Sequence, residues 1–403
     1  MVPTCLIVFS VLLSCLAICP CMAQAEAPWL NIRSFGAAGD GLADDTDAFE
    51  RALTAGREQS LPVLAPRGSY RLTRPLVLRN QALIGDNPGG WPADGMPMAV
   101  LRIEHTSGPG IVMQEFASLQ GLAVCYPEGT VFPEDGAPPA ISLAGQGPTI
   151  SQVRLQYPYD GIITAPGAAP GRARMSDIFI VAPRHDGVYL TRSYDVSQLR
   201  SIEVWCNGGM STGAGFRLGR NDDCQLSDLF AFQCQAGFLF ETDEAEGGGV
   251  FYGSLSDCST DACSLGYVVR GDHRINISNS DLIDHHTSLE IDGEKASVRV
   301  TGCQIQTNGA PAVRAVGCAN LSITNCIFMR AFNADFYFID AAACGSLTVS
   351  SCQFRDSSQG VRLGPGVERA VVAHNVFEAL DKPAIVDEML PTAKRILEPN
   401  ITM

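Results

Sequence analysis

One short phrase recurs along most of this chain and constrains its fold more than any other feature. Its copies start 22 to 29 residues apart, and a second phrase such as DGIIT or DGVYL follows each start by about ten residues. Both phrases alternate apolar and polar side chains, as β-strands do. Such a repeat predicts a solenoid whose equivalent phrases stack as parallel strands about 4.8 Å apart. The ten copies start at Ile150, Met175, Leu199, Leu226, Leu255, Ile277, Val300, Ile323, Val349 and Val372.

Residues 1–25 have the features of a secretory signal peptide. They carry no charged side chain, contain a long apolar run and end in Ala-Gln-Ala, a small–x–small cleavage pattern. The run is too short and too poorly flanked for a membrane span. Cys19 offers a lipoprotein alternative, but the preceding Ile18 fits such a site poorly. We therefore expect a secreted protein, periplasmic or extracellular.

The remaining chain is expected to form one elongated domain, although 403 residues would suggest two or three ordinary ones. Forty glycines, no long helical pattern after residue 60 and no linker favour this interpretation. A leucine-rich repeat is the competing solenoid, but its characteristic Leu spacing and Asn are absent. The expected division is a strand and capping helix over 26–60, the solenoid over 61–388 and a tail or cap over 389–403.

Cysteines fit the interior of such a solenoid. Four of the 15 lie in the leader, and the other 11 show no zinc-ligand spacing. Cys318 and Cys344 share one repeat position, where a disulfide is geometrically allowed. A second position is expected to form a column of buried thiols, because free Cys behaves as a small hydrophobic residue. That column holds Cys258, Cys303, Cys326 and Cys352, with Ser280 between the first two.

The N-terminal end reads FGAAGDGLADDTDAFERAL and then LAPRGSYRLTRPLVLRNQALIGDN. Residues 31–88 resemble the pectate lyase superfamily of rhamnogalacturonase- and epimerase-like proteins. The resemblance implies an all-β fold, a right-handed parallel β-helix of ten or more coils, with a capping helix over the open N-terminal end. It also implies that Asp40, Asp44 and Asp45 are turn and cap residues.

The resemblance implies a polysaccharide partner, with uronate-containing glycans included. Such proteins act as hydrolases, lyases or epimerases, or recognise glycans as phage-type spikes. The net charge of −15 argues against nucleic acid and anionic membranes, since both attract basic surfaces. We expect a glycoside hydrolase; the alternatives are a pectate-type lyase, an epimerase or a non-catalytic glycan-binding or adhesion protein.

The candidate catalytic residues precede the second phrase on adjacent coils. Asp160 lies in YPYDGIIT, and His185 and Asp186 lie in PRHDGVYL. Two close carboxylates can protonate a glycosidic oxygen and activate water or attack carbon. The Gly-His-Gly and Arg-x-Lys motifs of the similar polygalacturonases are absent. The alternative is that Asp-Gly merely begins a strand after a turn.

Three nearby residues are candidates for substrate binding. Tyr189 and Arg217 occupy the same outward position one coil apart, beside the Asp pair. Tyr189 could stack on a sugar, and Arg217 could hold a uronate carboxylate. In a lyase, Arg184 or Arg217 would instead serve as the base. The alternative is that all three are ordinary exposed sheet residues.

An acidic edge is expected in the turns after the second phrase. Oxygen-rich clusters can bind Ca²⁺, and pectate-type lyases use such ions to bridge substrate carboxylates. The spacing is not that of an EF-hand, so a solvated acidic edge is favoured and no cofactor is required. The candidate ligands are Asp222, Asp223, Asp243 and Glu244.

Overall fold

A computed structural model describes most of the chain after the leader. The segment predicted as a signal peptide lies outside the described residues. No helix within the described residues is long and apolar enough to cross a membrane. The described residues are 28–86, 98–134, 136–206, 211–245, 247–284, 286–330, 336–355, 359–378, 380 and 383–403.

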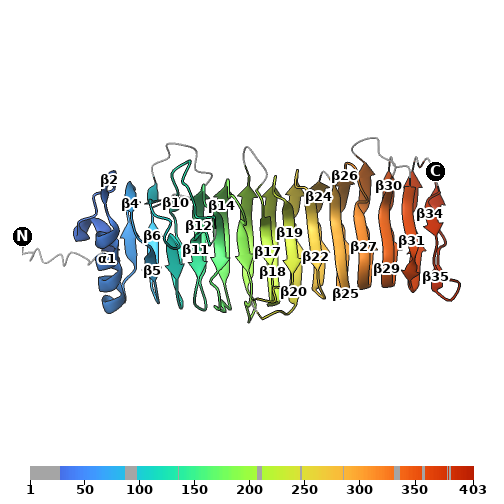
Figure 1. Ribbon diagram of the computed structural model, residues 1–403, viewed down its shortest axis with the longest axis horizontal. Coiled ribbons are helices and arrows are strands. Elements are labelled where there is room, and N and C mark those ends of the chain that lie inside the picture. The colour runs from blue at the N-terminus through green and yellow to red at the C-terminus, as the bar shows by residue number, and fades with distance from the viewer. Residues whose placement is uncertain are drawn as a thin grey trace, which may run out of the picture.

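These residues form a parallel β-solenoid of about 13 coils, with the α-helix at its N-terminal end (Figure 1). All ten predicted phrase starts are Cα partners in one ladder, from Ile150 with Met175 to Val349 with Val372. The predicted all-β fold class and the register are therefore confirmed. The strands of this ladder include β12 (Thr149–Gln156), β14 (Arg174–Val181), β16 (Gln198–Trp205), β18 (Asn221–Phe232), β20 (Phe251–Ser256), β23 (Arg274–Ser278), β25 (Thr287–Thr301), β27 (Val313–Thr324), β29 (Tyr337–Ser350) and β32 (Arg369–Ala373).

The second phrase forms a neighbouring parallel ladder. Its outward column runs through Ile163, Tyr189, Arg217, Leu239 and Val268, as the sequence predicts. This ladder carries the candidate site, because Asp160 and Asp186 lie at or just before the start of two of its strands. Its strands include β11 (Pro139–Leu143), β13 (Asp160–Thr164), β15 (Val188–Leu190), β17 (Ala214–Leu218), β19 (Ala236–Glu241) and β22 (Leu265–Arg270), followed by the first halves of β25, β27 and β29, and by β31 (Gln359–Val367).

The interior is filled by stacked side chains from successive coils. Phe216, Phe238 and Tyr267 stack with ring centroids 4.9 and 4.6 Å apart. The predicted thiol column is confirmed, because its four members are free cysteines with at most 2% of their surface exposed: Cys258, Cys303, Cys326 and Cys352. Burial of this apolar surface is the main driving force for stacking the coils.

The helix α1 (Thr46–Gln59) covers the first coil, as expected for a cap. Its buried face includes Phe49 and Leu53, and Phe49 packs edge-on against Tyr70 with centroids 5.3 Å apart. The three N-terminal aspartates accept local hydrogen bonds from backbone N–H groups at this end. The pairs are Asp40 with Leu42 and Ala43, Asp44 with Thr46, and Asp45 with Ala38 and Gly39. They are therefore turn and cap residues.

The C-terminal segment continues the stacking. The strands β35 (Lys394–Ile396) and β36 (Ile401–Thr402) pair in parallel with β32 and β33 (Val376–Glu378). Residues 389–403, expected as a tail or cap, thus add strands to the last coil.

Candidate functional site

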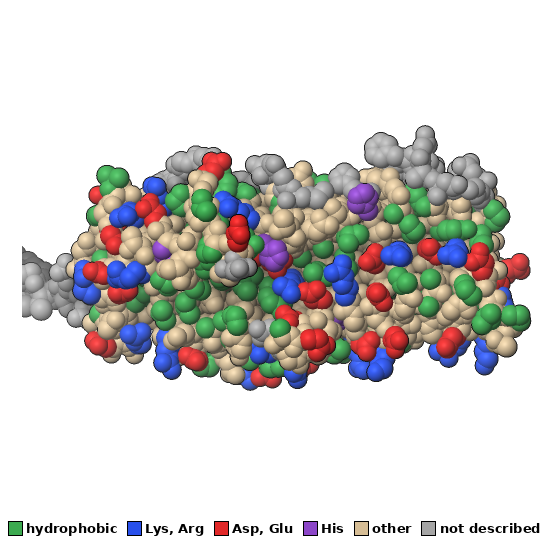
Figure 2. Space-filling view, in the orientation of Figure 1, with side chains coloured by type: hydrophobic (Ala, Val, Ile, Leu, Met, Phe, Trp, Pro, Cys, Tyr) green, Lys and Arg blue, Asp and Glu red, His purple; other side chains and the backbone are tan. Residues whose placement is uncertain are grey.

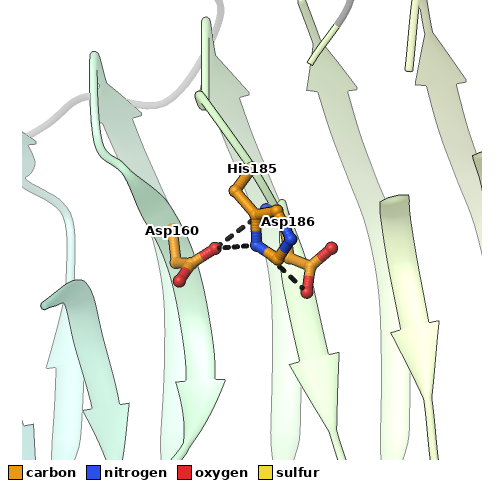
Figure 3. A group of neighbouring side chains, drawn as sticks. All are labelled: Asp160, His185 and Asp186. Carbon is orange, nitrogen blue, oxygen red and sulfur yellow. Dashed lines mark hydrogen bonds and ion pairs between the residues drawn. The ribbon is translucent and has the colours of Figure 1, made fainter. Parts of the chain in front are cut away.

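Two carboxyl groups and one imidazole meet where β13 and β15 begin. Because Ile162 pairs with Val188, Asp160 and Asp186 lie level on adjacent coils. Oδ1 of Asp160 accepts a hydrogen bond from the Asp186 backbone N–H at 2.8 Å and lies 2.9 Å from Nδ1 of His185. Figure 3 shows the imidazole ring between the two carboxyl groups. The structure thus brings together the three residues that the sequence singled out as catalytic.

Asp186 is buried, whereas Asp160 is half-buried. Only 3% of Asp186 is exposed, and its Oδ1 accepts the N–H of Ala214 on the next coil at 2.8 Å. Burial raises the pKa of this carboxyl above its ordinary value, although the charge of His185 and the Ala214 hydrogen bond oppose the shift. Asp186 therefore has the electrostatic setting of a proton donor.

His185 links the two carboxyl groups. Its Nδ1 lies 3.5 Å from Oδ2 of Asp186 as well as close to Asp160, and its ring stacks on Tyr159 at 5.9 Å. The hydrogen bond with Asp160 raises the pKa of His185 above 6.5, against the opposing effect of burial. The imidazole consequently keeps its proton to a higher pH than an isolated histidine does.

This shift predicts a pH-dependent stability. The contribution of protonated His185 is complete below pH 6.5, its ordinary value, and is lost as pH rises through the raised folded value. We expect the melting temperature of the natural protein to exceed that of a His185→Gln variant at about pH 6, and the difference to shrink by about pH 8. Calorimetry from pH 5 to 9 measures this; a difference that stays constant over that range contradicts the assignment.

Tyr189 and Arg217 lie beside the pair and contact each other. The Arg217 guanidinium lies 4.3 Å from the Tyr189 ring centroid, and only 7% of Tyr189 is exposed. The Tyr189 hydroxyl donates to Asp243 at 2.8 Å. The ring face is therefore covered, which contradicts the expected role of Tyr189 as a stacking surface for sugar.

Arg217 is held by three carboxyl groups. Its Nε lies 2.5 Å from Glu241, and its terminal nitrogens lie 3.5 Å from Asp186 and 3.8 Å from Asp243. Burial lowers the pKa of Arg217, but these acids together raise it above the ordinary value. Arg217 thus stays protonated, which does not suit the base of a lyase. Sequence reasoning missed Glu241, and it assigned Asp243 only to the acidic edge.

Arg184 points away from the carboxyl pair. Its Nη2 donates to the carbonyl oxygen of Thr130 at 2.6 Å, and its guanidinium lies 5.0 Å from the Phe132 ring centroid. The Arg184 side chain therefore contacts the loop that contains Thr130 and Phe132. This geometry does not place it as a substrate ligand or base.

The same three residues could in principle hold a divalent cation. Among the described residues, Asp160, His185 and Asp186 are the only group of three or more His, Cys, Asp or Glu side chains with ligand atoms within 4.8 Å of one another. However, the Arg217 guanidinium already places a positive charge 3.5 Å from Oδ2 of Asp186. The geometry therefore does not favour a second cation there. No such group is formed by the residues of the predicted acidic edge, Asp222, Asp223, Asp243 and Glu244.

A pocket of about 300 Å³ opens at His185 and Asp186 and runs toward the C-terminal coils. Its floor is aliphatic: Ala214, Ala236 and Val268 form a cluster outside the main core. On this face of the solenoid, charged side chains of both signs alternate with apolar ones (Figure 2). The remaining lining residues are Thr212, Gly213, Arg217, Gln235, Leu239, Glu241, Leu265 and Arg270.

Comparisons with known proteins agree with the fold. Residues 29–94 match the family model described as rhamnogalacturonase A/epimerase, pectate lyase-like, and residues 236–386 match the right-handed β-helix region. The resemblance to this superfamily is thus confirmed. A stretch of 73 residues is 30% identical to a glucan 1,3-β-glucosidase of Cochliobolus carbonum, covering 15% of this chain and 9% of that protein.

Two solved structures share the fold along most of the chain. The N-terminal fragment of bacteriophage phi29 gene product 12 has a TM-score of 0.64 and 14% identity, over 92% of this chain and 71% of the fragment. The A-module of the mannuronan C-5 epimerase AlgE6 of Azotobacter vinelandii has a TM-score of 0.54 and 13% identity, over 93% of this chain and 99% of the module. At these identities, the likeness shows the fold alone.

Proposed function

We propose that this protein, with its pectate lyase-like β-helix, is a secreted polysaccharide-degrading glycoside hydrolase. The observation that carries the proposal is the environment of Asp186, a buried carboxyl with a raised pKa at the end of a surface pocket. A second carboxyl, Asp160, lies on the adjacent coil. Glycosidic cleavage needs such a pair, one protonated and one charged.

In the proposed reaction, Asp186 gives its proton to the glycosidic oxygen as the bond to the anomeric carbon breaks. Asp160 attacks that carbon, and hydrogen bonds with the His185 ring and the Asp186 N–H hold its carboxyl group in place. Water then hydrolyses the glycosyl–Asp160 ester, returning its proton to Asp186. Since Asp186 must be protonated, activity should fall as pH rises through its raised pKa.

The arginines of the pocket have different tasks in this proposal. Arg217 is already paired with Glu241, so in this proposal it is a structural residue of the pocket wall rather than a substrate ligand. Arg270 lines the same pocket and has no ion pair within the described part of the chain. Its free guanidinium could receive the carboxylate of a uronate unit, which supports acidic glycans as one substrate class.

The separation of the carboxyl groups predicts the stereochemical course. One oxygen of Asp160 lies within 4.8 Å of one oxygen of Asp186. Retaining enzymes hold their carboxyl groups roughly 5 Å apart, whereas inverting enzymes need about 6.5–9.5 Å to admit water. We therefore expect the first-formed product to retain the anomeric configuration of the substrate. Proton NMR early in the reaction measures this. Inversion would show that Asp160 does not attack the sugar.

A further inference from the structure

Two cysteines outside the thiol column lie unusually close together. Cys318 on β27 and Cys344 on β29 are direct Cα partners in adjacent parallel strands, and their sulfur atoms are 3.0 Å apart. Both are buried, with 4% and 2% of their surface exposed. The neighbouring positions in this column are Gly293 and Val367, so the pair has no third thiol beside it in the column.

The hydrogen bonding of this pair differs from that of the thiol column. Within the described residues, Cys318 and Cys344 have each other as their only side-chain hydrogen-bond partner. Each thiol of the column instead donates to the carbonyl oxygen two residues earlier, at 3.3 to 3.4 Å. Those thiols are Cys258, Cys303, Cys326 and Cys352. They are therefore satisfied as thiols, whereas the pair leaves both sulfurs without a backbone acceptor.

We propose that Cys318 and Cys344 form a disulfide that ties two adjacent coils of the solenoid together. Ladder partners about 4.8 Å apart fall within the Cα separation that disulfides span. Closing the bond requires the sulfurs to approach from 3.0 Å to about 2.05 Å. This is a smaller movement than Cys206 and Cys234 would need, because their sulfurs are 3.5 Å apart.

The bond would form by exchange with a small-molecule or protein disulfide. The thiolate of Cys318 attacks the oxidant, releasing one thiolate and leaving a mixed disulfide. The thiolate of Cys344 then attacks the sulfur of Cys318 and displaces the second thiolate of the oxidant. One disulfide thus forms as one is reduced, and the two released thiolates take up the two protons. The hydrogen bond with Cys344 lowers the pKa of Cys318, which favours Cys318 as the first attacking group.

Peptide mapping tests this directly. The protein is equilibrated with oxidised and reduced glutathione, its free thiols are blocked with iodoacetamide as it is unfolded in denaturant, and it is digested with trypsin without reductant. Cleavage after Arg314, Arg330 and Arg355 yields peptides 315–330 and 331–355, which hold one cysteine of the pair and one of the column each. We expect these two peptides to be linked, with fragmentation assigning the bond to Cys318 and Cys344.

Matched variants separate the pair from the column. The linked species should vanish in Cys318→Ser and persist in Cys326→Ser, which changes the other cysteine of the same peptide. Reductant should lower the melting temperature of the natural protein by several degrees and leave that of Cys318→Ser unchanged. Complete alkylation of Cys318 and Cys344 in the oxidised sample, or a bond through Cys326, would overturn the proposal; the mapping of the natural protein decides this even if a variant fails to fold.

Discussion

Replacing Asp186 with Asn should reduce turnover by a factor of about 10²–10⁴, the contribution of a positioned general acid. The amide cannot donate a proton to the leaving oxygen, but its oxygen can still accept the N–H of Ala214. Asn is neutral and close in size to the protonated carboxyl, so no unpaired charge is buried and the melting temperature should change little. Initial rates on the accepted polysaccharide and a thermal melt measure both effects.

Asp340→Asn provides the matched control. Asp340 lies on the outer face of the same sheet, further along the column that contains Arg217, and pairs with Arg362 at 2.9 Å. Removing this carboxylate should leave turnover unchanged and cost at most about 1 kcal/mol of stability. Activity retained in Asp186→Asn, or lost equally in the control, would remove the carboxyl pair from the mechanism. Asp160→Asn should behave as Asp186→Asn does.

Replacing Cys303 with Asp should unfold the protein. Only 2% of Cys303 is exposed, and its sulfur donates to the carbonyl oxygen of Thr301. A carboxylate at this position would face that oxygen and the thiol of Cys326, with no cation beside it in the column. An unpaired buried charge costs about 3–5 kcal/mol or more, which is comparable to the whole stability of many domains.

Cys303→Ala keeps the position apolar and should cost only about 1–2 kcal/mol. Circular dichroism and thermal melts of the two variants separate the effect of charge from that of lost volume. If Cys303→Asp is soluble and melts near the natural protein, then the column faces solvent and the inward and outward faces of the coils are reversed.

The fold could be predicted because the repeat fixes the register. Each phrase start is a Cα partner of the next, from Ile150 to Val372, even though the spacing varies. Insertions are absorbed in the turns, while the two-residue alternation of the strands has to be kept for every inward side chain to stay inside. The motif in residues 31–88 predicted the N-terminal helix, because the open end of a stacked solenoid has to be covered by an atypical unit.

The site could be located but not fully described. Stacking alone placed Asp160 beside Asp186 and Tyr189 beside Arg217. The alternation of apolar and polar residues predicts which side chains point outward. It does not predict which other parts of the chain cover them. For Tyr189, the cover comes from the Arg217 side chain. For Asp186, the next coil supplies the contact, because the Ala214 backbone N–H donates to its carboxyl group.

Long side chains and turns account for the remaining errors. Glu241 reaches Arg217 from the end of β19, two residues after Leu239, which is the ladder partner of Arg217. Asp243 reaches it from the following turn, where no periodic pattern applies. Arg184 turns toward Thr130, which is far away in sequence. Such contacts depend on rotamers and loop paths, which the repeat does not determine.

The central claim is that the pocket at Asp186 hydrolyses a polysaccharide. The most direct test is mass spectrometry of the products formed from neutral and uronate polysaccharides, with and without chelator, with Asp186→Asn as the control enzyme. We expect fragments that carry one added water, formed equally with chelator and absent with the variant. Unsaturated fragments, which lack that water, or no product from any glycan would contradict it.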